Sequence, residues 1–207
     1  MPSSRGEVTA WQPGDVRDAA GGLFALALAT FVAVTTELVP VGLLPLISDD
    51  LAVSESVAGL LVTAYAFMVA ALALPLTSAT RRLPRKTVLL GTIAVYTVSN
   101  VIVALAPTFA VVAAARALGG AAHAVFFSVS IGYASRLVRP HLAGRALALV
   151  TLGASAGFIL GVPLSTSLGT AVGWRNAFLV LTGVCVVAGV LTALLLPSVA
   201  GGGAPPD

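Results

Sequence analysis

The stretch A-V-T-T-E-L-V-P-V-G-L-L-P, residues 33–45, decides how this chain folds. It places one carboxylate, Glu37, inside an otherwise uncharged apolar run from about residue 22 to residue 47. At about 1.5 Å per residue, a helix of that length crosses the hydrocarbon core of a bilayer. A carboxylate at mid-membrane depth costs roughly 2.5 to 3.5 kcal/mol, so we expect it to face a protein interior and to have a function there.

Pro40 follows Glu37 by three residues and has no backbone N–H to donate. The carbonyl of Thr36 therefore loses its helical partner beside the carboxylate, and Pro45 has the same effect on the carbonyl of Val41. These features predict a bent membrane helix that holds a proton or cation site.

The composition of the whole chain is that of a membrane protein. Hydrophobic residues make up 58%, charged residues 9%, and the mean hydropathy is +1.03, whereas an ordinary soluble domain is about one quarter charged. The only cysteine, Cys185, lies in an apolar run, which excludes an intrachain disulfide and a cysteine metal site. We expect no metal and no cofactor. The net charge of +3 does not indicate nucleic-acid binding, because the basic residues cluster in short loops between apolar runs.

Six apolar runs are long enough to span a bilayer. They follow a polar segment, residues 1–21, which we expect to be a disordered cytoplasmic tail and not a signal peptide. The last residues, 198–207, have the composition of a linker. The sequence predicts an all-α membrane domain over residues 22–197, with spans at about 22–47, 56–80, 86–106, 108–134, 142–168 and 175–196.

The basic residues predict the orientation of these spans, because cytoplasmic loops collect Lys and Arg. Nine of the eleven lie on one side, against Arg175 alone on the other, where the first loop is acidic. We therefore expect a multi-pass protein of the inner cell membrane with both termini in the cytoplasm. The nine are Arg5, Arg17, Arg81, Arg82, Arg85, Lys86, Arg136, Arg139 and Arg145.

The remaining base, Arg116, lies inside the fourth run. Its depth below the outer surface is roughly 12 Å, and that of Glu37 is roughly 15 Å. A buried acid and a buried base at one level are more stable together than apart. We therefore expect Glu37 and Arg116 to form a proton-coupling pair; the alternative is a static pair that fixes the helix register.

The fifth run contains Gly153, Gly157 and Gly161, followed by Pro163. Glycines at this spacing form a flat strip that lets another helix approach closely, and the proline permits a bend. Residues 153–157, G-A-S-A-G, also match the G-x-S-x-G pattern of serine hydrolases. That pattern requires a sharp turn from strand to helix, so an intramembrane hydrolase using Ser155 with His123 or His141 is a remote alternative.

Several polar and aromatic residues lie at mid-membrane depth and are candidates to line a cavity. The alternative role of Asn100 and of His123 is a single hydrogen bond to another helix. The alternative for the aromatic residues is packing against a neighbouring helix or contact with lipid. The candidates for the cavity are Tyr65, Asn100, His123 and Phe126, with Phe67, Phe127 and Phe158 as further aromatic residues.

The order of motifs resembles the first six spans of the major facilitator superfamily, most of all its bacterial drug and sugar efflux proton antiporters. The resemblance covers residues 22–197 and rests on E-L-V-P-V-G-L-L-P-L-I-S-D-D-L, A-G-L-L-V-T-A-Y-A-F, R-R-L-P-R-K, A-R-A-L-G-G-A-A-H-A-V-F-F-S-V, G-V-P-L and G-W-R-N-A-F.

The resemblance implies a role for several of these residues. Glu37 would be the membrane acid, and Arg116 with Gly120 the arginine motif associated with proton coupling. The glycines of the fifth run with Pro163 would form the bend and the seal between two halves. Arg81, Arg82, Arg85 and Lys86 match the conserved cytoplasmic loop, although Arg81 and Pro84 stand where the family usually has aspartate and glycine. Pro163 also follows Gly161 by two residues instead of one.

The family implies about twelve spans in two halves, each made of two inverted three-span repeats. This chain supplies one half, so transport would need a second six-span half from a missing C-terminal portion, a separate chain or a second copy. The expected function is export of small drug-like or sugar-like molecules in exchange for protons, with the proton gradient as energy source and no enzymatic step. The alternative is a non-transporting accessory or regulatory membrane subunit.

Overall fold

The computed structural model describes residues 14–197. It contains six long α-helices, and each coincides with one of the six apolar runs and is long and apolar enough to cross a membrane. The helices are α1 (Ala20–Asp50), α2 (Glu55–Ala79), α3 (Arg85–Leu105), α4 (Phe109–Leu137), α5 (Ala143–Val172) and α6 (Trp174–Leu195), with a short 3-10 helix, η1 (Pro140–Leu142), before α5. Within these residues there is no β-strand, only an isolated bridge between Gly14 and Val138.

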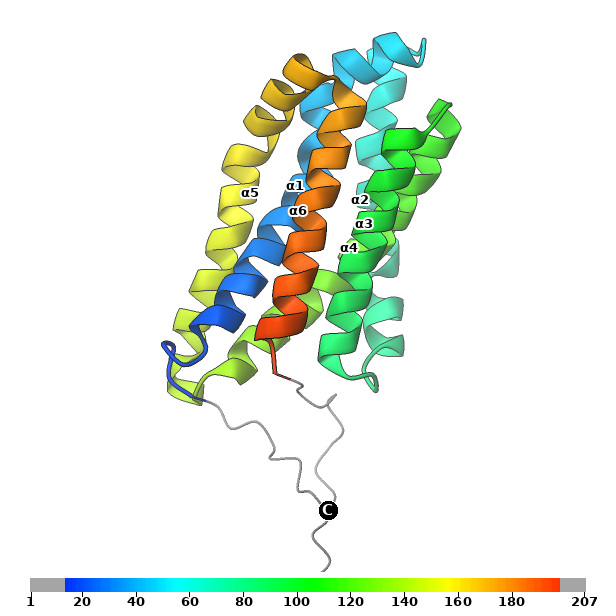
Figure 1. Ribbon diagram of the computed structural model, residues 1–207. Coiled ribbons are helices and arrows are strands. Elements are labelled where there is room, and N and C mark those ends of the chain that lie inside the picture. Colours follow the sequence, from blue (N-terminus) through cyan, green and yellow to red (C-terminus); the bar gives the residue numbers. More distant parts are fainter. Residues whose placement is uncertain (1–13, 198–207) are drawn as a thin grey trace, which may run out of the picture.

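The helices form one bundle, in which α1 packs most closely against α5, and α4 against α2 (Figure 1). Helix α3 contacts α4 just as α6 contacts α1, and α3 and α6 pack against each other. If α1, α2 and α3 exchange places with α4, α5 and α6 in that order, largely the same pairs of packed helices result. This is the arrangement expected of two inverted three-helix repeats.

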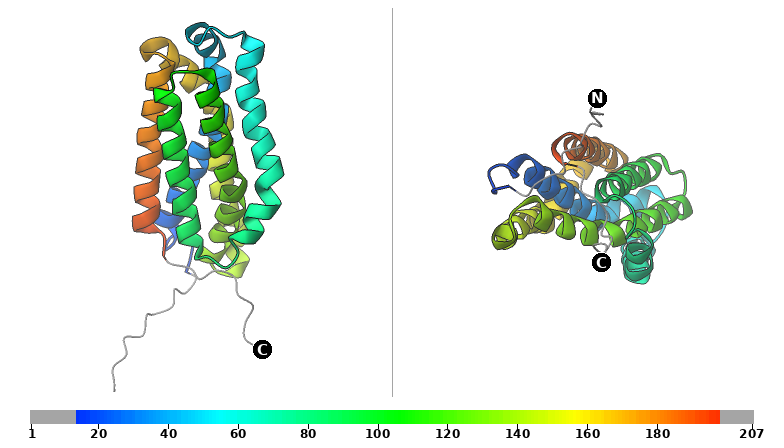
Figure 2. Two further views of the ribbon diagram at one scale, coloured as in Figure 1. Left: turned by 90° about the vertical axis from the view of Figure 1, so that its right-hand side faces the viewer. Right: turned by 90° about the horizontal axis from the view of Figure 1, so that it is seen from below.

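The two ends of the described chain lie at the same end of the bundle, as an even number of spans requires (Figure 2). The segment before α1 packs against the connection between α4 and α5. There, the backbone N–H of Arg139 donates to the carbonyl of Gly14 at 3.2 Å, and the Arg139 guanidinium lies 3.2 Å from the Asp15 carboxylate. The predicted disordered tail therefore does not extend to residue 21. Residues 1–13 of the predicted tail and the predicted linker at 198–207 lie outside the described residues.

Burial differs sharply between the helices. Most of the apolar stretch of α1 is buried, whereas less than a third of that in each of α2, α5 and α6 is buried. The exposed side chains are large and apolar, for example Leu74 at 85%, Phe67 at 68% and Ile159 at 70%. A surface of this kind is stable only against lipid or another apolar protein surface. The bundle is therefore built to lie within a membrane.

Candidate functional site

The Arg116 guanidinium lies at the centre of the bundle and is fully buried. Its Nη1 donates to the backbone carbonyl of Thr36 at 2.6 Å, and its Nη2 donates to the backbone carbonyl of Glu37 at 2.8 Å. The Thr36 carbonyl is the one that Pro40 leaves without a helical partner. Helix α1 continues through Pro40 because a side chain of α4 replaces the missing hydrogen bond.

The structure corrects the predicted contact between Glu37 and Arg116. The two residues are adjacent, but both hydrogen bonds from Arg116 to α1 end on backbone carbonyls and not on the carboxylate. The basic side chain that faces the Glu37 carboxylate is His123, whose Nε2 lies 3.6 Å from Oε2. The physical reason is local: Pro40 frees the Thr36 carbonyl, and the guanidinium binds this acceptor together with the neighbouring carbonyl of Glu37.

Tyr65, on α2, links Arg116 to His123. The Arg116 guanidinium carbon lies 4.2 Å from the centroid of the Tyr65 ring, which is a cation–π contact. The Tyr65 hydroxyl lies 2.8 Å from Nδ1 of His123. Four side chains from α1, α2 and α4 are thus in continuous contact. We call them the polar cluster: Glu37, His123, Tyr65 and Arg116.

Exposure falls along the polar cluster from one end to the other. The Glu37 side chain is 28% exposed and that of His123 is 8% exposed, while Tyr65 and Arg116 are fully buried. Glu37 is therefore the member that a proton from outside the bundle reaches first. Chemically, the arrangement presents one accessible carboxylate backed by an imidazole, a phenol and a fixed positive charge.

Asn100 supports the polar cluster from α3. Its Nδ2 lies 3.4 Å from Oγ1 of Thr36 and 3.5 Å from Sγ of Cys185, so it joins α3 to α1 and α6. Asn100 therefore makes interhelical hydrogen bonds, which was the alternative to lining a cavity. Asn100, Tyr65 and Phe126 are all fully buried, so the structure places these cavity candidates in the packed interior behind Glu37.

The glycine strip of α5 packs against α1. A Cβ added to Gly157 would lie 2.8 Å from Cβ of Val34, and one added to Gly153 would overlap the backbone of Ala27. Gly161 lies over Thr35, where an added Cβ would be 3.5 Å from Cα. The strip therefore lets α5 approach the helix that holds Glu37, whereas Pro163 is exposed on the other side of α5.

The connection from α2 to α3 is the predicted cytoplasmic loop. In it Arg81 and Arg82 are exposed, and Arg85 and Lys86 are half-buried at the start of α3. Lys86 has a role that the sequence did not reveal. Its Nζ donates to the carbonyls of Ala193 at 2.7 Å and Leu196 at 2.6 Å, and so caps the C-terminal end of α6. A lysine that caps a helix end follows general rules, but the sequence alone could not say which helix.

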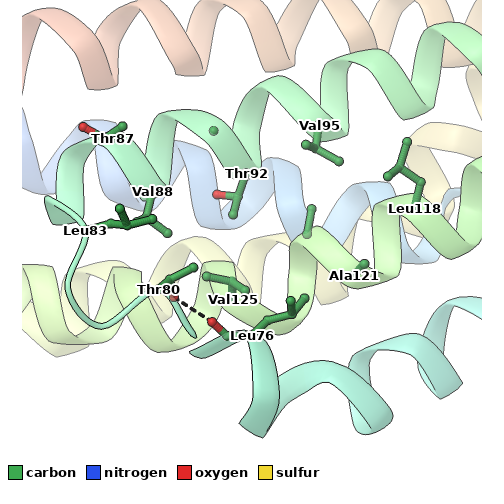
Figure 3. A pocket seen from close by; sticks show the side chains of 12 residues that line it. Leu76, Thr80, Leu83, Thr87, Val88, Thr92, Val95, Leu118, Ala121 and Val125 are labelled. Carbon is green, nitrogen blue, oxygen red and sulfur yellow. Dashed lines mark hydrogen bonds between the residues drawn. The ribbon is translucent and has the colours of Figure 1, made fainter. Parts of the chain in front are cut away.

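An apolar groove on the described part of the chain lies apart from the polar cluster (Figure 3). It has a volume of about 420 Å³ between the end of α2, the start of α3 and the middle of α4. None of its lining residues is charged or belongs to the polar cluster, and Figure 3 shows mainly aliphatic side chains, among them Leu76, Val88, Val95 and Val125. A groove of this chemistry offers no site for a proton.

The described residues contain no group of three or more His, Cys, Asp or Glu side chains that could hold a metal ion. The hydrolase alternative is wrong on geometry. Ser155 lies inside the continuous helix Ala143–Val172, not on a sharp turn between a strand and a helix.

Six spanning helices around a polar centre define a multi-pass membrane protein of the transporter type. The family model described as Major Facilitator Superfamily matches residues 26–206, and the chain belongs to this family. Its members are transporters and not enzymes, and both the six-helix fold and the resemblance found in the sequence are thereby confirmed.

Relatives and solved structures agree with this assignment. The chain is 38% identical over 175 residues to a chloramphenicol efflux pump of Mycobacterium tuberculosis, covering 84% of this chain and 42% of the pump. It is 35% identical over 175 residues to a probable sugar efflux transporter of Helicobacter pylori, covering 84% and 45%. The crystal structure of a bacterial homologue of the human lysosomal transporter Spinster has the same fold, with a TM-score of 0.78 at 16% identity over 94% of this chain and 46% of that one. The chain spans less than half the length of these proteins.

Proposed function

We propose that this chain is the N-terminal half of a proton-coupled efflux transporter that exports small drug-like or sugar-like molecules in exchange for protons. The observation that carries the proposal is Glu37, a carboxylate 28% exposed in the middle of a spanning helix. A carboxylate at that depth is costly unless it has a function. The similarity to a chloramphenicol efflux pump and to a probable sugar efflux transporter supports the direction and the substrate class.

In this mechanism Glu37 binds a proton at one stage of the cycle and releases it at another. Arg116 is the second proton-coupling residue, and it acts by holding the α1 backbone beside the carboxylate at 2.6 and 2.8 Å. The glycine strip keeps α5 against the same helix. The proton gradient supplies the energy, so the cycle needs no cofactor.

The charge distribution supports an inner-membrane protein with both termini in the cytoplasm. The end of the bundle at which α1 begins and α6 ends also holds Arg81, Arg82, Arg85 and Lys86 in the connection from α2 to α3. The opposite end has Asp49 and Asp50 at the end of α1.

A transporter of this family needs a second six-span half. The exposed apolar surfaces of α2 and α5 support such a partner, as does the coverage of less than half of each efflux relative. A complete transporter can be tested by joining this chain to the C-terminal half of the Mycobacterium tuberculosis chloramphenicol efflux pump. The fusion would be reconstituted in lipid vesicles under an imposed pH gradient.

We expect the fusion to move radiolabelled chloramphenicol against its gradient, and Glu37→Gln to abolish this movement. Glu55→Gln is the matched control, because Glu55 lies at the exposed start of α2. Undiminished export by Glu37→Gln would contradict the proposal. Vesicles with the unfused chain test whether a second copy can supply the missing half: pH-driven substrate movement there would exclude the accessory-subunit alternative.

A further inference from the structure

We infer that His123 is a neutral hydrogen-bond donor that positions the ionised Glu37 carboxylate, and that Tyr65 selects the imidazole tautomer able to donate. His123 is a positioning residue in this account. What Glu37 does with its proton rests on the proposed function, whereas the hydrogen-bond arrangement rests on geometry alone.

The argument begins at the Tyr65 hydroxyl, which is fully buried. Across residues 14–197 its polar neighbours are Nδ1 of His123, at 2.8 Å, and the Tyr96 hydroxyl, which has no other hydrogen-bond partner. If Nδ1 held a hydrogen, the hydrogens of Nδ1, Tyr65 and Tyr96 would share only the two hydroxyl oxygens as acceptors, and one buried hydrogen would lack a partner. A buried donor without an acceptor is costly. The Tyr65 hydroxyl therefore donates its hydrogen, and Nδ1 of His123 accepts it.

A neutral imidazole that accepts at Nδ1 has its hydrogen at Nε2. Nε2 lies 3.6 Å from Oε2 of Glu37, somewhat longer than a hydrogen bond. A small rotation of the Glu37 side chain closes this gap, because that side chain is 28% exposed while His123 is 8% exposed. An ionised carboxylate accepts such a bond strongly, and a protonated one accepts it weakly. Protonation of Glu37 therefore releases the carboxyl group from His123.

The groups that surround His123 are Glu37 from α1, Tyr65 from α2, Tyr96 from α3 and Arg116 and Phe127 from α4. The Glu37 carboxylate favours a charged imidazole, whereas burial and the Arg116 guanidinium favour a neutral one. The Arg116 guanidinium stacks on the same Tyr65 ring whose hydroxyl binds His123. A second positive charge on His123 would repel the first in a medium of low dielectric constant. The neutral donor satisfies both neighbours without that repulsion.

The tautomer can be measured directly, because the chain has only two histidines, His123 and His141. The chain would be labelled with ¹⁵N-histidine and placed in lipid nanodiscs, with His141→Gln to leave the His123 signals alone. The ¹⁵N shifts distinguish a protonated from an unprotonated ring nitrogen. We expect hydrogen at Nε2 and none at Nδ1 at neutral pH. Hydrogen at Nδ1, in the other tautomer or in a charged ring, would overturn the inference.

Two tyrosine variants test the role of Tyr65. Tyr65→Phe removes the donor to Nδ1, so we expect the preference for one tautomer to be lost. Tyr96→Phe is the matched control: its ring centroid lies 6.1 Å from that of His123, and its hydroxyl lies beside that of Tyr65, so its removal keeps the Tyr65 donor to Nδ1. Circular dichroism would check that both variants remain helical. Equal spectra in the two variants would count against the assignment.

The positioning role has its own readout in the fusion transporter. Glutamine offers a donor and an acceptor like a neutral imidazole but does not titrate, whereas leucine offers neither. We expect His123→Gln to export roughly ten- to hundredfold faster than His123→Leu, the range for a hydrogen bond to a charged group. An equal loss of export in both variants would contradict the positioning role of His123. If the unaltered fusion shows no pH-driven export, the proposed function fails while the tautomer result still stands.

Discussion

Arg116 donates a hydrogen bond from Nη1 to the backbone carbonyl of Thr36 at 2.6 Å, across the gap between α4 and α1. This carbonyl has no partner within α1, because Pro40 lacks the N–H that would reach it. The buried arginine and the proline within the helix therefore compensate for each other. Each would be costly in the interior of a membrane bundle without the other.

This relationship predicts coupling between Pro40→Ala and Arg116→Gln. An alanine at position 40 supplies the missing N–H, so removing Arg116 should cost less in that background. We expect a coupling free energy of about 1 to 3 kcal/mol, the desolvation cost of one unsatisfied buried group. It would be measured as a double-mutant cycle by unfolding in detergent micelles. Pro45→Ala is the control, and its effect should add to that of Arg116→Gln within about 0.5 kcal/mol.

The approach of α5 to α1 predicts that Gly153→Ala is destabilising. The added Cβ overlaps the backbone of Ala27, which cannot move aside as a flexible side chain can. We expect a loss of about 1 to 3 kcal/mol in the free energy of unfolding. Gly144→Ala, in the same helix but with no heavy atom within 4 Å of the added Cβ, should be neutral or stabilising by up to about 1 kcal/mol. Equal effects of the two changes would argue against the close contact.

The cap on α6 predicts a local effect of Lys86→Met. Without the two bonds from Nζ to the carbonyls of Ala193 and Leu196, the last turn of α6 should open more often. Hydrogen–deuterium exchange should then rise in a peptide covering the end of α6 and stay unchanged in the middle of that helix. Arg82→Met, an exposed position of the same loop, should leave both regions unchanged. A uniform rise across α6 would instead indicate global destabilisation.

Arg175 and Asp50 form an ion pair at the opposite end of the bundle. The two side chains are 36% and 44% exposed, so Asp50→Asn should change the free energy of unfolding by less than about 1 kcal/mol. Arg175→Met should cost more, because Arg175 also donates to the carbonyl of Ala106 at 3.0 Å and stacks on Trp174. The small effect of Asp50→Asn should vanish at high salt, while the larger effect of Arg175→Met should persist. Both can be followed by thermal unfolding.

The six spanning helices, the family, the acid at mid-membrane depth and the orphan carbonyl of Thr36 could all be predicted from the sequence. These follow from local properties: the length of an apolar run, the absence of a proline N–H and the order of motifs along the chain. Depth arguments also placed Arg116 at the level of Glu37, and the two are adjacent in the structure.

The tertiary structure alone decided which groups meet. It directed Arg116 to the α1 backbone, His123 to the Glu37 carboxylate, the α5 glycines to α1 and Lys86 to the end of α6. These contacts depend on the rotation of each helix about its axis and on shifts of less than one helical turn. Hydropathy fixes the depth of a residue in the membrane but not the direction in which its side chain points, so only packing among the six helices selects the partners.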